Sequence, residues 1–284
     1  MLIEAILYGG FGLIFGSFAN VLILRHDTEH SLGGRSACPA CKRTLEWFEL
    51  VPLFSWVVLR GRCRTCHARI SVQYPLVEGV MMLGFIGIGL ASMPLIERVL
   101  GCAIFFFLLA LLVYDLRHMI LPDAWVFASA GLMLLSSIYA LMFAGAPLVS
   151  YLILLAAGPF VALPLFLMWY VSKGAWMGFG DVKFALGIGW LLGIGYGYLA
   201  LMYAFVIGAV VGVCVLLPLP RIIGVLRRIR AGFTPTPTSE KSVWGFTMKS
   251  EVPFGPFLIL GTCIIWFSIL YQHDPAPFLF GGSL

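Results

Sequence analysis

Long apolar runs separated by short polar stretches dominate the chain. The runs are continuous rather than alternating in apolar and polar positions, which favours helices over the strands of a membrane barrel. A helix that crosses a bilayer needs about 20 predominantly apolar residues, and several runs have this length. They cover Leu2–Leu24, Pro75–Ser92, Leu95–Tyr114, Ala124–Phe143, Pro147–Val171 and Phe254–Tyr271.

A further run, Phe184–Pro220, carries no charged residue and is too long for one crossing. Its central Gly193–Gly197 stretch predicts a turn, and the helix before that turn should be short. We therefore expect an all-α, polytopic bundle of about eight transmembrane helices. The predicted division is a first transmembrane helix (1–24), an extramembrane segment (25–74) and a transmembrane helical core (75–284).

The composition supports a membrane protein surrounded by a lipid bilayer. Hydrophobic residues make up 61% of the chain, charged residues only 11%, and the mean hydropathy is +1.00. Soluble domains carry about 25% charged residues. The first run has no basic region before it and no small-residue cleavage site, so we interpret it as a retained helix and not a signal peptide. The net charge of +5 does not indicate a nucleic-acid partner, because the basic residues lie between the helices.

The distribution of basic residues predicts the topology. Of the 18 Lys and Arg residues, only Arg98 lies outside the segments 25–74, 115–123, 172–183 and 221–253. Cytoplasmic loops are enriched in Lys and Arg, and a bundle of eight helices places all these segments on one side. We therefore expect an inner-membrane protein with both termini in the periplasm. Segment 221–253 is interpreted as setting orientation and contacting anionic headgroups.

Four of the seven cysteines form two C-x-x-C hooks, Cys38–Cys41 and Cys63–Cys66. Two such hooks are typical of tetrahedral Zn²⁺ bound by four thiolates. Disulfides would need an oxidising compartment, whereas the predicted topology places the hooks in the cytoplasm. A closed four-thiolate site indicates a structural ion, although zinc thiolates that accept a methyl group remain an alternative. The remaining cysteines are interpreted as small packing residues.

Two aspartates lie at the predicted cytoplasmic membrane edge and are candidates for catalysis. Asp115 ends the third run, and Asp181 precedes the charge-free run. Ionisable residues at such positions are functional candidates, and two adjacent carboxylates that share a proton can activate water for peptide hydrolysis. Gly178 and Gly180 flank Asp181 and permit unusual backbone angles and the close approach of a substrate strand. The alternative is that Asp181 only caps a helix.

Three other polar residues near the same edge have simpler interpretations. Asp123 follows Pro122 at a predicted helix start, so it is interpreted as an N-cap. His118 is interpreted as an interfacial bystander. Glu78 lies one turn into the second span, where the helix dipole favours a carboxylate, and its function stays open.

The series of motifs, taken in order, resembles bacterial type IV prepilin peptidases, which also serve type II secretion. The resemblance is carried by Gly16–Val21 (GSFANV), both C-x-x-C hooks, Ile70–Glu78, Asp115–Asp123, the G-x-G-D-x-K run Gly178–Lys183 and Pro253–Phe257 (PFGPF). It implies that Asp115 and Asp181 are catalytic and that Cys38, Cys41, Cys63 and Cys66 bind zinc.

The resemblance also implies two activities. One removes the leader of a prepilin or pseudopilin at the cytoplasmic face, and the other methylates the new N-terminal amine from S-adenosylmethionine. No nucleotide-binding fingerprint is present, so the second activity and its cofactor depend on resemblance alone. Two rival interpretations are an ion-coupled transporter or proton channel with the aspartates as a relay, and a zinc-bearing scaffold without catalysis.

Overall fold

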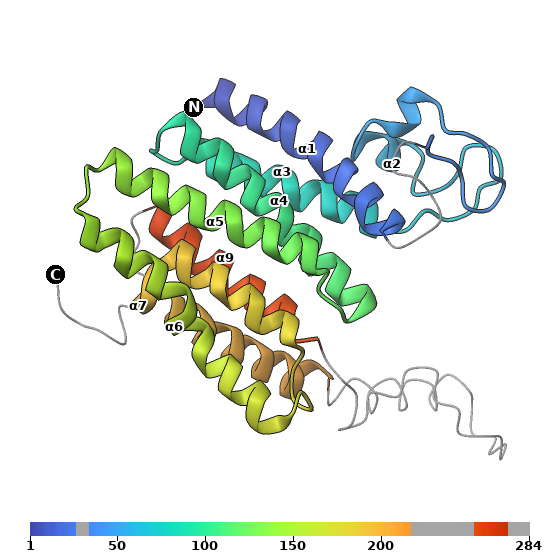
Figure 1. The fold of residues 1–284 in the computed structure, drawn as a ribbon. Coiled ribbons are helices and arrows are strands. Elements are labelled where there is room, and N and C mark those ends of the chain that lie inside the picture. The colour runs from blue at the N-terminus through green and yellow to red at the C-terminus, as the bar shows by residue number, and fades with distance from the viewer. Residues whose placement is uncertain (27–33, 217–252, 272–284) are drawn as a thin grey trace, which may run out of the picture.

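A computed structural model of the chain describes residues 1–26, 34–216 and 253–271 (Figure 1). Most of these residues are helical, and the main non-helical part is the segment between the first two long helices. They contain two isolated bridges, Ala37 with Thr44 and Arg62 with Arg69, and no longer strand. The predicted basic segment 221–253 lies outside the described residues except for Pro253, as does the C-terminal end from 272.

The helices follow one another in the predicted order, and the prediction of an all-α membrane bundle is confirmed. Those long and apolar enough to cross a membrane are α1 (Leu2–Arg25), α3 (Gln73–Leu90), α4 (Leu95–His118), α5 (Asp123–Phe143), α6 (Leu148–Ser172) and α7 (Phe179–Val211). Shorter elements are η1 (Trp47–Leu50), α2 (Phe54–Val58), η2 (Gly212–Leu216) and α9 (Gly255–Leu270). The chain is a multi-pass membrane protein with a cysteine-bearing segment between its first two spans.

Helix α7 reverses direction at Gly193, inside the predicted turn. Gly193 has φ 74° and ψ −176°, a backbone conformation that suits glycine. Before it, the Trp190 Nε1–H donates to the carbonyl of Leu155 in α6 at 3.3 Å. After it, the Tyr198 hydroxyl donates to the carbonyl of Phe160 at 2.6 Å, so the chain has turned back along α6. The two halves of α7 run as antiparallel helices in Figure 1, which confirms the predicted pair.

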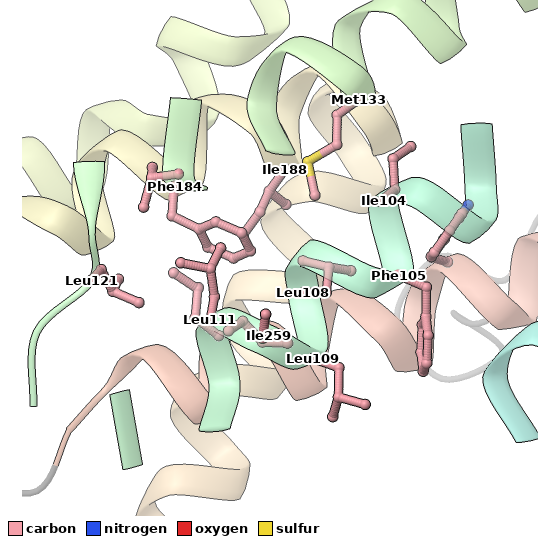
Figure 2. Close-up of a cluster of buried hydrophobic side chains, with 14 of the residues drawn as sticks. Ile104, Phe105, Leu108, Leu109, Leu111, Leu121, Met133, Phe184, Ile188 and Ile259 are labelled. Carbon is pink, nitrogen blue, oxygen red and sulfur yellow. The ribbon is translucent and has the colours of Figure 1, made fainter. Parts of the chain in front are cut away.

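Helix α4 forms the centre of the bundle. It packs against α1, α3, α5 and α9. Of its most apolar stretch, 67% of the residues are buried, against 22–39% in the other spans. Leu108 and Leu111 of α4 meet Phe184 of α7 and Ile259 of α9 in one buried cluster (Figure 2). Because lipid is as apolar as these side chains, close packing rather than removal from water holds such helices together.

Glycines bring α1 and α3 into close contact. A Cβ on Gly12 would lie 2.6 Å from the Cα of Met82, and one on Gly16 would lie 2.7 Å from the Cα of Glu78. This is the G-x-x-x-G arrangement that lets two membrane helices approach along their backbones. The close packing fixes where α3 begins relative to α1, and therefore where the intervening cysteine segment is attached.

Helix α4 extends one turn beyond the predicted span, to His118. The extra turn is held by the His118 ring, which stacks on Tyr114 with centroids 4.4 Å apart, and it ends at Met119 in the left-handed conformation. Asp115 therefore lies inside a helix and not at its end. A hydropathy pattern cannot show this turn, because Asp115 and Arg117 interrupt the apolar run while the helix continues.

Candidate active site and metal site

Asp115 and Asp181 come together at the end of the bundle that carries the cysteine segment. Asp115 lies in the last turns of α4 and is 4% exposed, and Asp181 lies in the first turn of α7 and is 6% exposed. A Cβ placed on Gly255 at the start of α9 would overlap the Asp115 Oδ2 atom and lie 3.5 Å from Asp181 Oδ1. Both carboxylates thus border the same point, and they interact electrostatically.

The cap alternative for Asp181 is excluded by the geometry of α7. The helix is capped by Gly178, and its N-terminus receives no hydrogen bond from a side chain. The Asp181 carboxylate instead lies close to Gly255 of α9 and interacts with Asp115. The Asp115 carboxylate accepts a hydrogen bond from the Gly255 backbone N–H. Two buried carboxylates held in this way can share one proton, which is the arrangement required for one to act as a base and the other as an acid.

Gly255 is a site residue that sequence reasoning missed. The Pro253–Phe257 run was noted only as part of a resemblance, with no role for its glycine. Gly255 is buried, and α9 starts there with Pro256 in its first turn. A glycine followed by proline at a helix start is a weak signal, and nothing local relates it to aspartates far away in sequence.

The two glycines beside Asp181 do not adopt the unusual angles that were expected. Gly178 has φ −72° and ψ 150°, and neither it nor Gly180 is among the residues with positive φ. A Cβ on Gly180 would lie 3.1 Å from the Cβ of Leu121, so this glycine provides close packing between α7 and the α4–α5 connection. Gly178 is exposed, and a Cβ there would meet only the Gly180 backbone N, at 3.9 Å.

The interpretation of Asp123 as an N-cap is wrong. Pro122 is the N-cap of α5, and no side chain caps that helix. The Asp123 carboxylate instead accepts hydrogen bonds from Lys183 Nζ, 2.7 Å from each oxygen. Lys183 follows Asp181 in α7, so the ion pair joins α5 to α7 beside the aspartate pair. Capping is lost because Asp123 already has helical geometry and its side chain reaches across to the lysine.

A polar network connects the first three spans at the same end. The Asn20 Nδ2–H donates to the carbonyl of Tyr74 at 3.2 Å, and its Oδ1 accepts from Gln73 Nε2 at 3.3 Å. The Gln73 Oε1 accepts from Arg117 Nη1 at 2.9 Å. Arg117 lies two residues after Asp115, so the α1–α3 junction is tied to the helix that carries one aspartate.

The four loop cysteines form a cluster suited to one metal ion. The Sγ atoms of Cys38, Cys41, Cys63 and Cys66 all lie within 4.8 Å of one another, and all four thiols are free. Cys38 and Cys66 are 3.7 Å apart, far beyond a disulfide bond. A tetrahedral Zn²⁺ with bonds of about 2.3 Å separates its sulfurs by about 3.8 Å. The donor set therefore fits zinc.

Each hook folds into the same tight turn. Cys38 N–H donates to Arg43, and Cys63 N–H donates to Ala68. The residue after each second cysteine, Lys42 in one hook and His67 in the other, has positive φ. Backbone N–H groups inside each turn face the first sulfur, and those of Cys66 and Thr65 lower the pKa of Cys63 to about 6.

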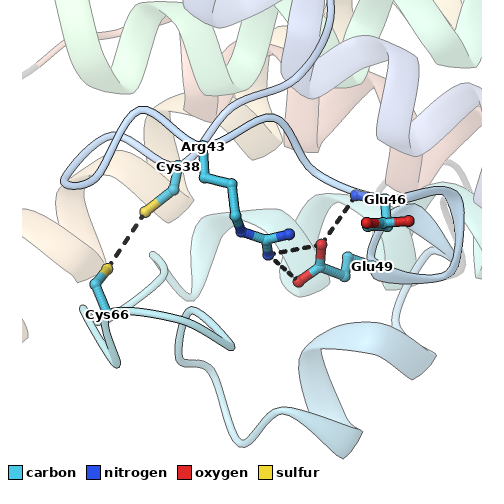
Figure 3. Close-up of polar contacts among 5 residues, drawn as sticks. All are labelled: Cys38, Arg43, Glu46, Glu49 and Cys66. Atoms are coloured by element: carbon cyan, nitrogen blue, oxygen red, sulfur yellow. Dashed lines mark hydrogen bonds and ion pairs between the residues drawn. The ribbon is translucent and has the colours of Figure 1, made fainter.

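A partly buried ion pair supports the cysteine cluster. Arg43 Nη2 donates to both oxygens of Glu49 at 2.6 and 2.8 Å (Figure 3). Glu49 also accepts from the Glu46 backbone N–H at 2.9 Å. These two donors hold the pKa of Glu49 below its usual range. The guanidinium also interacts with the Cys63 sulfur, so it would offset part of the negative charge of a four-thiolate zinc centre.

Fold and site together define a class of protein: a multi-pass helical membrane protein that buries an aspartate pair and carries a four-cysteine cluster. Two protein-family models match, "Bacterial Peptidase A24 N-terminal domain" over residues 11–92 and "Type IV leader peptidase family" over residues 102–213. The chain belongs to the type IV leader peptidase family. No solved structure matches the chain.

Curated relatives named prepilin leader peptidase/N-methyltransferase match most of the chain. The protein of Pectobacterium carotovorum is 31% identical over 89% of this chain and 89% of its own length. That of Vibrio cholerae is 27% identical over 93% of this chain and 96% of its own. That of Bacillus subtilis is 30% identical over 73% of this chain and 81% of its own.

Proposed function

We propose that this chain is a membrane peptidase that cleaves the leader of type IV prepilins or type II secretion pseudopilins, with Asp115 and Asp181 as its catalytic pair. The observation that carries the proposal is the meeting of both buried carboxylates at Gly255. The names of the relatives support the substrate class. An ion-coupled transporter or channel is not favoured, because the family matched is one of peptidases.

The aspartate pair can hydrolyse a peptide bond without a metal or a covalent intermediate. The ionised carboxylate removes a proton from a water molecule, whose oxygen attacks the scissile carbonyl carbon. The protonated carboxyl donates its proton to the carbonyl oxygen. Collapse of the tetrahedral intermediate breaks the C–N bond, and the leaving amine takes the proton gained by the first carboxylate. A hydroxyl proton of the intermediate returns to the second carboxylate, which restores the singly protonated pair. The Gly255 N–H orients Asp115 throughout.

The depth of the pair suits the substrate. A prepilin has a short polar leader followed by a long apolar helix. Asp115 lies one turn before the end of α4, and Asp181 lies in the first turn of α7. If the apolar helix of the substrate lies in lipid against the spans, its scissile bond reaches the interface at the level of these residues. The exposed backbone at Gly178 is the proposed approach for the substrate strand.

The proposed location is the bacterial inner membrane, with the cysteine segment and the active site on the cytoplasmic side. Both termini would then lie in the periplasm. The charge distribution of the sequence supports this orientation, as do the four free thiols, which suit a reducing compartment. The partners we propose are prepilins or pseudopilins and the bilayer.

Methyl transfer is proposed from the names of the relatives. Purified enzyme given a prepilin and S-adenosylmethionine should release the leader and methylate the new N-terminal amine. Asp181→Asn should cleave poorly but still methylate a pilin cleaved beforehand, because methyl transfer needs no water-activating pair. Mass spectrometry of the pilin N-terminus measures both reactions. Loss of methylation in a folded Asp181→Asn enzyme would show that the two sites overlap.

Zinc is proposed as a structural ion at Cys38, Cys41, Cys63 and Cys66. Purified protein should hold about one zinc per chain, measured by elemental mass spectrometry. Changing all four cysteines to Ser should remove the metal and destabilise the segment, because a bound ion would join the two hooks. Cys214→Ser is the matched control, since that exposed cysteine lies outside the cluster. Full zinc retention by the quadruple variant would contradict the assignment.

A further inference from the structure

The cysteine segment presents a strongly apolar surface that the metal site does not explain. We define the interfacial face as Trp47, Phe48, Phe54, Val57 and Val58, of which Trp47 and Val58 are 79% and 78% exposed. Helix α2 has no buried residue. A hollow in this face is lined by Phe48, Val51, Phe54, Ser55, Val58, Leu59 and Arg64. An exposed apolar patch of this kind marks an interaction site.

The attachment of this face to α3 fixes its depth. The Leu53 backbone N–H, directly before α2, donates to Glu78 Oε2 at 2.8 Å. The Leu53 side chain also lies 4.0 Å from a Cβ position at Gly79. Glu78 is five residues into α3, about 7.5 Å along the helix axis. The start of α2 is therefore level with the second turn of a spanning helix.

Helix α3 is too short to extend beyond the hydrocarbon core of the membrane. Its 18 residues span about 27 Å, whereas the hydrocarbon core of a bilayer is about 30 Å thick. A contact in its second turn therefore lies below the headgroups. Lipid-facing residues of α3 surround that level, since Leu76 and Leu83 are 63% and 64% exposed. The interfacial face therefore lies at the same depth as the side chains of α3 that face lipid.

The charges around the face complement phospholipid headgroups. Arg60, Arg62 and Arg64 follow α2 and are exposed. The Arg64 guanidinium lies over the Phe48 ring, 5.3 Å from its centroid, at the hollow. The nearby acid Glu49 forms its ion pair with Arg43 and not with these arginines. Trp beside Arg over an apolar surface is the composition found at membrane interfaces.

We infer that residues 47–58 form an interfacial anchor, which inserts the interfacial face into the adjacent bilayer leaflet and takes a phospholipid acyl chain in the hollow, with the phosphate on Arg64. The anchor would hold the cysteine segment against the membrane at a fixed height. The partner is the lipid bilayer, and the inference does not depend on the proposed peptidase activity.

Lipid photolabelling of the full-length, zinc-loaded protein tests the anchor. The protein is reconstituted in vesicles of phosphatidylethanolamine and phosphatidylglycerol that contain a phospholipid with a diazirine near the top of one acyl chain. We expect adducts on peptides covering 47–58 at a yield comparable with α3, and none on the exposed turn 39–42. Unlabelled 47–58 alongside labelled α3 would overturn the inference.

Two variants separate insertion from folding. Val58→Asp places a charge at an exposed position of the face and should lower adduct yield on 47–58 several-fold, while zinc content stays unchanged. Ala144→Asp adds the same charge at an exposed position just after α5, at the other end of the bundle, and should leave the yield unchanged. Unchanged labelling in Val58→Asp would contradict insertion. Cross-linking of the face by a diazirine-bearing prepilin, in place of lipid, would assign the surface to a protein partner and overturn the anchor.

Discussion

Asp115→Asn and Asp181→Asn should each slow prepilin cleavage by about 100- to 10,000-fold, the usual contribution of general acid–base catalysis. Either change removes an ionisable group at nearly constant shape, and the pair shares a single function. Because the two residues act as a unit, the double variant should be little slower than either single variant. Cleavage rates of one prepilin by all three purified variants, compared with the unchanged enzyme, provide the measurement.

Asp123→Asn is the matched control, since it makes the same chemical change at the same end of the bundle. Asp123 is 61% exposed and is paired with Lys183. Exposed ion pairs contribute about 0–1 kcal/mol to stability, so this variant should stay folded and cleave within a few-fold of the unchanged enzyme. Thermal unfolding of the bundle and zinc content of the cysteine segment verify folding in every variant. Strong cleavage by Asp115→Asn, together with its loss in Asp123→Asn, would mean that the pair is wrongly assigned.

The parts of the fold that could be predicted are those encoded by short stretches of sequence. Apolar runs located the spans, the glycine-rich stretch at Gly193 located the reversal of α7, and the C-x-x-C spacing located the cysteine cluster. Each of these signals lies within a few residues or one helix length. The approach of Asp115 to Asp181 was a hypothesis, based on the prediction that both residues lie at the same edge of the membrane. The structure brings the two carboxylates together.

The features that escaped prediction are contacts between distant segments. Glu78 could be placed on a helix but not related to Leu53, whose N–H it accepts. Asp123 had the sequence context of a cap, and only the packing of α5 against α7 gives it Lys183 as a partner. Gly255 had no visible reason to be glycine until α9 was placed against α4. Periodicity specifies which face of a helix is apolar, but not which distant residue meets it.

Gly255→Ala should reduce cleavage by about 100-fold, the effect of displacing a catalytic group by about 1 Å. The added methyl group would occupy the position of Asp115 Oδ2, so the carboxylate must rotate or α9 must move away. Either movement weakens the hydrogen bond from the residue 255 backbone N–H to Asp115. The backbone at 255 is compatible with alanine, since its φ is not positive, and alanine generally favours a helix over glycine. The loss should therefore appear in cleavage, with zinc content unchanged.

Gly131→Ala is the control for this prediction, because a Cβ at Gly131 in α5 would meet nothing within 4 Å. It should cleave at the rate of the unchanged enzyme. Gly255→Ser should be at least as impaired as Gly255→Ala, since its side chain is larger at the same point. Unimpaired cleavage by Gly255→Ala would show that α9 does not border the working aspartate pair. Slow cleavage by Gly131→Ala as well would mean that the enzyme is sensitive to any helix substitution, and the inference from the Asp115 contact would fail.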